Sequence, residues 1–341
     1  MAFNYKRSVI VLIIVLFFLL SIKGLAQDKV GGPITLGTSS VGSAFYIMSV
    51  GIGEIISKKV GINITVESVG GSDANARALG KKKIDLAMLN SLSVASAYQG
   101  KGSFVKEGKI DLRVIAQGQQ AIRNIITRTV SGIKTPYDLR GKRFIGKRPA
   151  LADLEMITNA LLKAYGIPVD SLKLLQTIET KEALEALKIG IADGAIIPAG
   201  LRSSTLLELT QSVDITFLSI SEEKMKQILH ELGPAFQEAI IPKGTYRGQT
   251  EDVRAPSLIA VIAVRSDFPE ALAYTITKTI LESEKELQAV HSEAKEWNVK
   301  NSLRLPPAPF HPGTIRYFKE KGLWSIELEK YNEILIKTGR N

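Results

Sequence analysis

Short runs of apolar residues alternate along the chain with longer stretches in which apolar residues recur every three or four positions. Short apolar runs are typical of buried strands, and the longer pattern is typical of helices packed on a sheet. Their alternation predicts an α/β fold with largely parallel sheets. In the first series, strands are predicted at 34–37, 62–69 and 84–89, and helices at 43–59 and 72–81. The apolar stripe of the first helix is Ile47, Met48, Ile52, Ile55 and Ile56.

A second series follows, with strands predicted at 142–146, 172–177 and 193–198 and helices at 151–165 and 181–189. The segments ALGKKKIDLAML, ending at Leu89, and ALKIGIADGAII, ending at Ile197, share an Ala-Leu helix end, a turn, an Asp and an apolar strand. Coincidence between two ordinary βα units explains this likeness, and so do two similar domains with a cleft between them.

Two apolar regions predict strands that cross between the domains. The strands 112–117 and 122–128 have only Gly118 as a turn residue between them, which favours one long strand. Residues 257–264 are the predicted return crossover, and 268–290 a long helix packing back on the first domain. This predicts one lobe from residues 28–118 plus 258–341, and a second lobe from 119–257. The prolines near the end are expected in a surface loop before the last helices: Pro306, Pro307 and Pro309.

The N-terminus is typical of a secretory signal peptide. Lys6 and Arg7 precede an apolar run of 13 residues, 8–20, which is shorter than the ~20 needed to span a bilayer. Gly24 and Ala26 suit cleavage after Ala26, so residues 1–26 are the expected signal peptide and the mature protein is expected in the periplasm. An uncleaved anchor is the alternative, whereas the lack of any Cys excludes a lipid-modified one.

Composition narrows the possible partners. The chain carries a formal net charge of +10, and losing Lys6, Arg7 and Lys23 with the leader leaves 10 − 3 = +7. Because the basic residues are dispersed and export separates the protein from nucleic acid, no nucleic-acid partner is expected. With no Cys, the fold has neither disulfides nor thiolate metal sites.

Little in the sequence points to catalysis. The HELG segment at His230 lacks the second His of a zinc protease helix, GxSxG does not occur, and GKRFIGKR does not match the GxxxxGK[ST] phosphate loop. No pair of carboxylates is singled out for acid–base work. No enzyme activity, cofactor or metal is therefore expected, although catalytic residues need not be adjacent in sequence.

Three loops have the design of a ligand site, since each follows a predicted strand and opens a helix whose first N–H groups are unpaired. Such loops lie at the carboxyl ends of strands, where open α/β sheets bind ligands. Each is also compatible with an ordinary βα turn. Ser72 is a plausible N-cap, Tyr46 suits either the core or ligand stacking, and Asn90 suits either the cleft or a helix cap. The candidate ligand-binding residues are Thr38, Ser39, Ser40, Gly42, Ser43 and Tyr46; Gly71, Ser72 and Asn75; Asn90; and Lys147 and Arg148, in the loop Gly146 to Ala150.

Arg148 ranks above Lys147 as the anion-binding residue of the third loop. A guanidinium can grip a carboxylate through two parallel N–H bonds, whereas an ammonium acts as a point charge. The alternative is that both side chains are solvated surface charges on a basic protein.

At these residues the sequence resembles the TAXI family of TRAP-transporter solute-binding proteins, from about Ile34 to Trp324. The resemblance rests on the following segments: TSSVGSAFY (38–46), ESVGGSDANARAL (67–79) with IDLAML after it, DLRGKR (138–143), IPKGTYRGQTEDV (241–253) and FHPGTIRYFKEKGLW (310–324). It implies a type II periplasmic binding fold, with two α/β lobes, crossover strands and a ligand cleft between the lobes. It further implies delivery of an organic acid or amino acid, often glutamate-like or a dicarboxylate, to TRAP membrane subunits driven by an ion gradient, without a cofactor.

One loop departs from the family pattern. The family usually has small Gly and Ser residues after Gly146, where this chain has Lys147, Arg148, Pro149, Ala150 and Leu151. The cleft wall is therefore expected to be bulkier and more cationic.

Three functions remain open, in descending order of preference: a monomeric transport receptor for a small anionic ligand, a binding protein that reports to a membrane sensor, and an exported enzyme.

Overall fold

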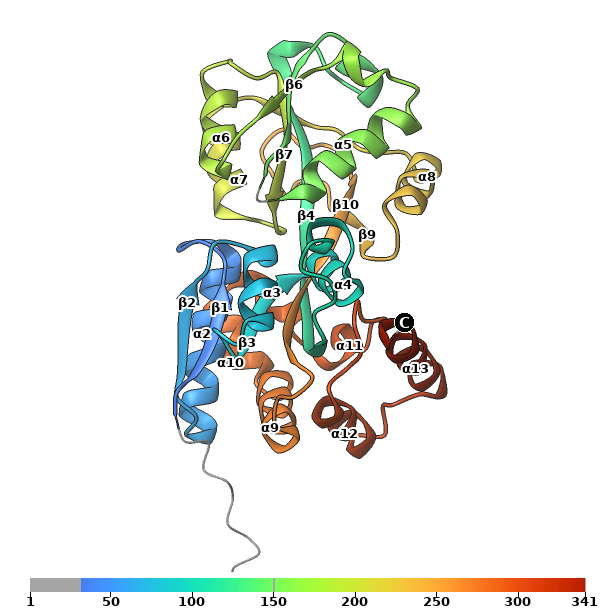
Figure 1. Ribbon diagram of the computed structural model, residues 1–341. Helices are drawn as coiled ribbons and strands as arrows, with labels where there is room; N and C mark the ends of the chain where they lie inside the picture. Colours follow the sequence, from blue (N-terminus) through green and yellow to red (C-terminus); the bar gives the residue numbers. More distant parts are fainter. Residues whose placement is uncertain (1–31, 150, 341) are drawn as a thin grey trace, which may run out of the picture. The chain divides into compact units, whose positions relative to one another are not determined.

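A computed structural model describes residues 32–149 and 151–340, and it has the expected α/β fold (Figure 1). The predicted signal peptide and Ala150 lie outside the described residues. The strands and helices predicted for the first series all occur, and each boundary lies within two residues of the prediction. The elements of this series are β1 (Ile34–Thr38), α2 (Ala44–Val60), β2 (Ile64–Ser68), α3 (Ser72–Gly80), β3 (Leu86–Asn90) and α4 (Ser91–Gln99).

The second series also follows the predicted order. Its elements are β5 (Arg143–Lys147), α5 (Ala152–Ala164), β6 (Lys173–Gln176), α6 (Thr180–Lys188), β7 (Gly194–Ala199), α7 (Ser204–Ser212), β8 (Ile215–Phe217), α8 (Glu222–Leu232) and β9 (Phe236–Ile241).

Two long strands connect the series. The strand β4 (Leu112–Arg128) is continuous over 17 residues, and β10 (Val253–Arg265) lies antiparallel beside it (Figure 1). Through them all strands join one hydrogen-bonded sheet in the order β2-β1-β3-β10-β4-β7-β5-β6, with β8 on β4 and β9 on β10. Pairs within each series are parallel, but every pair that includes β4 or β10 is antiparallel. The expectation of largely parallel sheets is therefore too simple, because the crossing strands run back against their neighbours.

Apolar side chains bury themselves on both faces of this sheet. One cluster joins β1, α2, β3 and the C-terminal helices around the first half of β4. In the second half of β4, successive residues belong to different hydrophobic clusters. Ile125 packs with α5 and α8, whereas Ile126 packs with α6 and α7. This split follows from the two-residue period of a strand, which sends neighbouring side chains to opposite faces.

From Ile34 onward the chain is one compact unit. Because no boundary divides this unit, the predicted lobes, residues 28–118 plus 258–341 and residues 119–257, remain a prediction about which parts of the chain move together.

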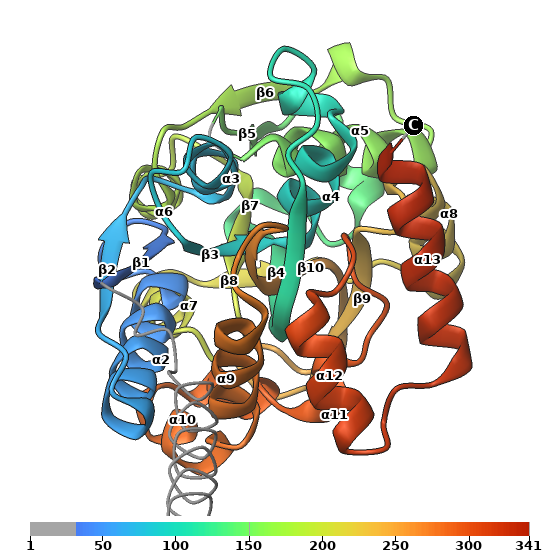
Figure 2. The ribbon, with the colours of Figure 1, turned by 60° about the horizontal axis from the view of Figure 1, so that its bottom comes forward.

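The C-terminal region departs from the sequence-based expectation. The single helix predicted over 268–290 is broken into α9 (Glu270–Leu281) and α10 (Glu284–Val290) at Ser283, whose buried hydroxyl accepts a hydrogen bond from Lys59 Nζ at 2.8 Å. The chain ends with α11 (Val299–Ser302), α12 (Pro312–Glu320) and α13 (Ile326–Arg340), shown at the near end in Figure 2.

Two smaller expectations are also wrong. The proline segment is a loop, but Pro306 and Pro309 are buried, because the Pro309 carbonyl accepts a hydrogen bond from Val114 N at 2.8 Å at the edge of β4. In α2, Met48, Ile52 and Ile56 form the buried stripe, whereas Ile47 is 36% exposed.

Candidate ligand-binding site

A cavity of about 550 Å³ lies at the carboxyl ends of strands from both series. Its volume is within the range of small-molecule sites. It is lined by residues 39–45, Gly70 to Ser72, Asn90, the middle of β4, the loop after β5, α6, the end of β7 with Gly200, α7, and Glu293. Apolar side chains from Phe45, Leu151, Leu184 and Leu209 share the lining with the polar groups described below.

The start of α2 forms one wall. Ser43 is the N-cap, and its hydroxyl accepts a hydrogen bond from Tyr46 N at 3.2 Å. Gly42 has a φ of 81°, in the left-handed region that glycine adopts without strain, so the loop turns sharply into the helix. Together Ser39, Ser40, Gly42 and Ser43 line the cavity beside the positive end of the helix.

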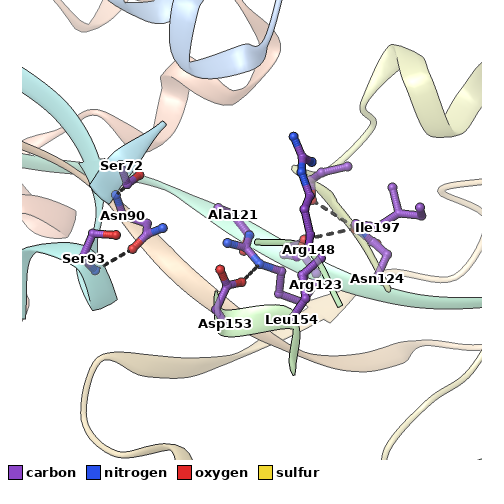
Figure 3. Close-up of polar contacts among 12 residues, drawn as sticks. Ser72, Asn90, Ser93, Ala121, Arg123, Asn124, Arg148, Asp153, Leu154 and Ile197 are labelled. Carbon is purple, nitrogen blue, oxygen red and sulfur yellow. Dashed lines mark hydrogen bonds and ion pairs between the residues drawn. The ribbon is translucent and has the colours of Figure 1, made fainter. Parts of the chain in front are cut away.

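A second wall is built from α3 and α4. The expected N-cap role of Ser72 is wrong: Gly71 is the N-cap of α3, and the Ser72 hydroxyl instead accepts a hydrogen bond from Asn90 N at 3.0 Å. Asn90 lines the cavity and also caps α4 by accepting a hydrogen bond from Ser93 N at 2.8 Å (Figure 3). The two roles considered for Asn90 therefore occur together.

Two arginines form the cationic wall (Figure 3). Arg123, on β4, has a side chain only 3% exposed and forms an ion pair with the equally buried Asp153 of α5. Its Nη1 also donates to the Ala121 carbonyl at 2.9 Å. Because removing a charge from water costs several kcal/mol unless it is paired, Asp153 is what allows Arg123 to occupy this position.

Arg148 enters the cavity from the loop after β5, with a side chain 11% exposed. Its Nη1 donates to Thr180 Oγ1 at 2.7 Å and its Nη2 to Glu179 Oε2 at 3.0 Å, while its Nε is buried without a partner. Burial lowers the pKa of Arg148, and the charge of Arg123 acts in the same direction. The unpaired Nε of Arg148 and the nearby second guanidinium favour an anion at this wall.

Four of the predicted site residues lie outside the cavity lining. The Thr38 hydroxyl is fully buried and accepts a hydrogen bond from Ser49 at 3.0 Å. Asn75 is buried and donates to the Met88 carbonyl at 3.1 Å. Tyr46 is half-buried one position beyond Phe45, which does line the cavity, and Lys147 turns to Glu155, 2.8 Å from its ammonium.

Sequence reasoning missed the three buried polar residues of the lining outside the predicted loops, namely Gln119, Arg123 and Glu293. For Gln119 and Arg123 a signal existed, because polar residues interrupt an otherwise apolar, buried strand. Glu293 belongs to a short 3-10 segment, Ser292–Glu296, that no periodicity marks. Burial and the nearby Glu296 carboxylate raise its pKa to about 8.

Within residues 32–149 and 151–340, no three His, Asp or Glu side chains are grouped as metal ligands. The helices of the same part of the chain are all too short or too polar to cross a bilayer.

The fold is that of type II periplasmic solute-binding proteins. The chain is similar to PhnD1 from Prochlorococcus marinus (MIT 9301), solved in complex with methylphosphonate, with 10% identity, a TM-score of 0.52, and coverage of 85% of this chain and 98% of PhnD1. It is similar to a protein from Bordetella bronchiseptica RB50 with 14% identity, a TM-score of 0.50, and coverage of 85% and 82%. The alkanesulfonate-binding protein SsuA from Xanthomonas axonopodis pv. citri, bound to MOPS, has 15% identity, a TM-score of 0.44, and coverage of 89% and 94%.

A substrate-binding protein of an ABC uptake transporter from Streptococcus pneumoniae, solved with bound histidine, has 16% identity, a TM-score of 0.48, and coverage of 78% and 94%. The model of the NMT1-like family matches residues 36–322, well over half of the sequence. The chain therefore belongs to the NMT1-like family.

Proposed function

We propose that this protein is an extracytoplasmic solute-binding protein that captures a small anionic metabolite for a TRAP-type transporter. The observation that carries the proposal is a pair of arginines, the buried Arg123 and the largely buried Arg148, in the wall of a ligand-sized cavity. The TRAP system itself is supported by the TAXI-like sequence segments. The predicted signal peptide supports a periplasmic location.

The chemistry of the wall supports an anion with a planar, two-oxygen end. Arg123 is already neutralised by Asp153, whereas the partner of Arg148, Glu179, is largely exposed to solvent and its ion pair is correspondingly weak. A carboxylate can therefore bind the unpaired Nε of Arg148 in a low-dielectric setting, where charge-assisted hydrogen bonds are strong.

The helix ends add to this preference. The loop 39–43 and Gly71 place the N-termini of α2 and α3 on the cavity, and both helices present unpaired N–H groups there. These partial positive charges act on the same ligand as the guanidiniums.

The first step of the test is to identify the ligand, by native mass spectrometry of the purified protein and by melting-shift screening of organic acids and amino acids. Arg148→Ala should then weaken binding by about 30-fold or more, because losing one partner of a buried charged contact costs roughly 2–5 kcal/mol and 1.4 kcal/mol is tenfold. Calorimetry measures the affinity.

Lys147→Ala is the matched control, since it removes a neighbouring cation that faces Glu155 instead of the cavity. Its affinity should stay within about threefold of the unmodified protein, and both variants should keep the same unliganded fold. An Arg148→Ala affinity within threefold, or melting shifts only with neutral sugars or polyamines, would overturn the proposal.

A further inference from the structure

The cavity contains a second polar region, where β4 lies beside the 3-10 segment Ser292–Glu296. Three buried side-chain atoms of the lining have no hydrogen-bond partner: Arg148 Nε, Gln119 Nε2 and Glu293 Oε1. The side chains of Gln119 and Glu293 belong to residues only 1% and 4% exposed. In native proteins nearly all buried polar atoms have a hydrogen-bond partner. Gln119 Nε2 and Glu293 Oε1 therefore indicate that a partner is missing at this wall.

The orientation of the Gln119 amide follows from its other contact. Its Oε1 accepts a hydrogen bond from the indole Nε1 of Trp297, which is fully buried. An indole N–H can only donate, so the amide oxygen must face Trp297 and the amide nitrogen must face away from it. Gln119 therefore presents N–H donors that require an acceptor.

Glu293 lines the same cavity and is positioned by His291 and Gly200. It lies one turn before Trp297, and its own main-chain N donates to His291 Nδ1 at 3.2 Å. Its carboxyl group covers the backbone of Gly200, where an added Cβ would lie 1.6 Å from Glu293 Oε1. Gly200 thus makes room for this carboxyl group at the cavity wall.

Burial without a cation nearby favours the neutral form of this carboxylic acid. The titratable groups around it are the Glu296 carboxylate, the His291 imidazole and, at the Gly200 carbonyl, the Tyr246 hydroxyl. Burial lowers the pKa of His291, and its Nδ1 accepts a hydrogen bond from Glu293 N, so the imidazole is held in its neutral form. A neutral carboxyl group both donates and accepts hydrogen bonds.

We propose that Gln119 and Glu293 bind an uncharged hydroxyl group of the ligand, so that the anion held by the arginines is a hydroxy acid. This inference rests on the proposed function and adds the second recognition group of the same cavity. A hydroxyl group accepts from Gln119 Nε2 and exchanges a hydrogen bond with Glu293. An ammonium group has no acceptor for Gln119, and a methylene group leaves both side chains unpaired.

The preference for a hydroxyl over an ammonium or methylene group should be measurable, because a buried polar group left without a partner costs about 1–3 kcal/mol. Calorimetry with three sets of probes tests it, each set differing at one carbon only: lactate, alanine and propionate; malate, aspartate and succinate; 2-hydroxyglutarate, glutamate and glutarate. In at least one set the hydroxy acid should bind tenfold or more tightly than both other members.

Two results would overturn the inference in different ways. If acids bind but no hydroxy acid exceeds its amino or deoxy counterpart by more than threefold, the hydroxyl assignment fails and the anion-binding function stands. If no acid of any set binds, both the assignment and the proposed function fail.

Matched variants locate the preference. Glu293→Gln keeps a neutral group that donates and accepts, and should retain the preference, whereas Glu293→Met should reduce it to within threefold. Gln119→Glu keeps the acceptor for Trp297 but removes the N–H donors, and should have the same effect as Glu293→Met. Glu251→Gln, at an exposed carboxylate outside the cavity lining, should change nothing. Equal preference in all four variants would contradict the assignment.

Discussion

Arg123 and Asp153 lie 30 positions apart and are both almost fully buried against one another. Burying either side chain alone would be unfavourable, since an unpaired buried charge costs several kcal/mol. Their pairing fixes a guanidinium in the cavity wall before any ligand arrives. Glu293, by contrast, has no cation as partner, and burial therefore disfavours the ionised form of its carboxyl group.

The raised pKa of Glu293 predicts a pH-dependent stability. Its pKa rises from 4.5 to about 8 on folding, mainly through burial. Between these values the folded protein holds a proton that the unfolded chain has released, so the free energy of unfolding should fall as pH rises from about 5 to 8. Over that range the fall should approach about 1.4 kcal/mol for each increase of one in pH.

Glu293→Gln removes this titration. Relative to the unmodified protein, the variant should gain stability steadily as pH rises from about 5 to 8, as measured by urea unfolding at several pH values. The buried groups nearby, Glu296, His291 and Tyr246, are present in both proteins, so their titration largely cancels in the difference. Parallel stability curves would show that Glu293 is ionised throughout.

Among the elements, β4 is the one that organises the cavity. It contributes Gln119, Ala121 and Arg123 to the lining, and it is continuous through Gly118, in agreement with the single long strand that the sequence favoured. Gly118 serves a different purpose: a Cβ there would lie 2.1 Å from Trp297 Cε2. Glycine lets the buried indole lie directly on the strand.

Gly118→Ala should therefore destabilise the protein by about 1–3 kcal/mol or more, since the methyl group must displace a packed indole. Urea unfolding measures the loss, and tryptophan fluorescence reports the displacement. Gly53→Ala in α2 is the control, because there the nearest atom to the new Cβ is 3.1 Å away and alanine favours helix. A smaller loss at Gly118 than at Gly53 would contradict this account.

For the whole molecule, we predict that residues 28–118 plus 258–341 and residues 119–257 close on the ligand about β4 and β10. The cavity takes residues from both groups, so a bound ligand draws them together. Saturating ligand should make the protein more compact in small-angle scattering. At a hundredfold excess over Kd it should also stabilise the fold by about 2.7 kcal/mol, seen as a higher Tm. Unchanged scattering at saturation would exclude closure.

The elements could largely be read from the sequence because their causes are local. Apolar periodicity marks strands and helices, and Gly and Ser residues mark the loops that open α2 and α3. The break between α9 and α10 was missed, although Ser283 and Glu286 have the Ser-x-x-Glu spacing of a helix N-terminus.

The candidate site divides in the same way. Local pattern was enough to show that strand ends carry polar loops, and eight of the twelve predicted residues line the cavity: Ser39, Ser40, Gly42, Ser43, Gly71, Ser72, Asn90 and Arg148. Only the tertiary structure shows that Lys147 faces Glu155, that Asp153 pairs with the buried Arg123, and that Gln119 and Glu293 line the same cavity. The reason is physical: strand ends follow from local pattern, whereas the direction and partner of a side chain depend on residues that are distant in sequence.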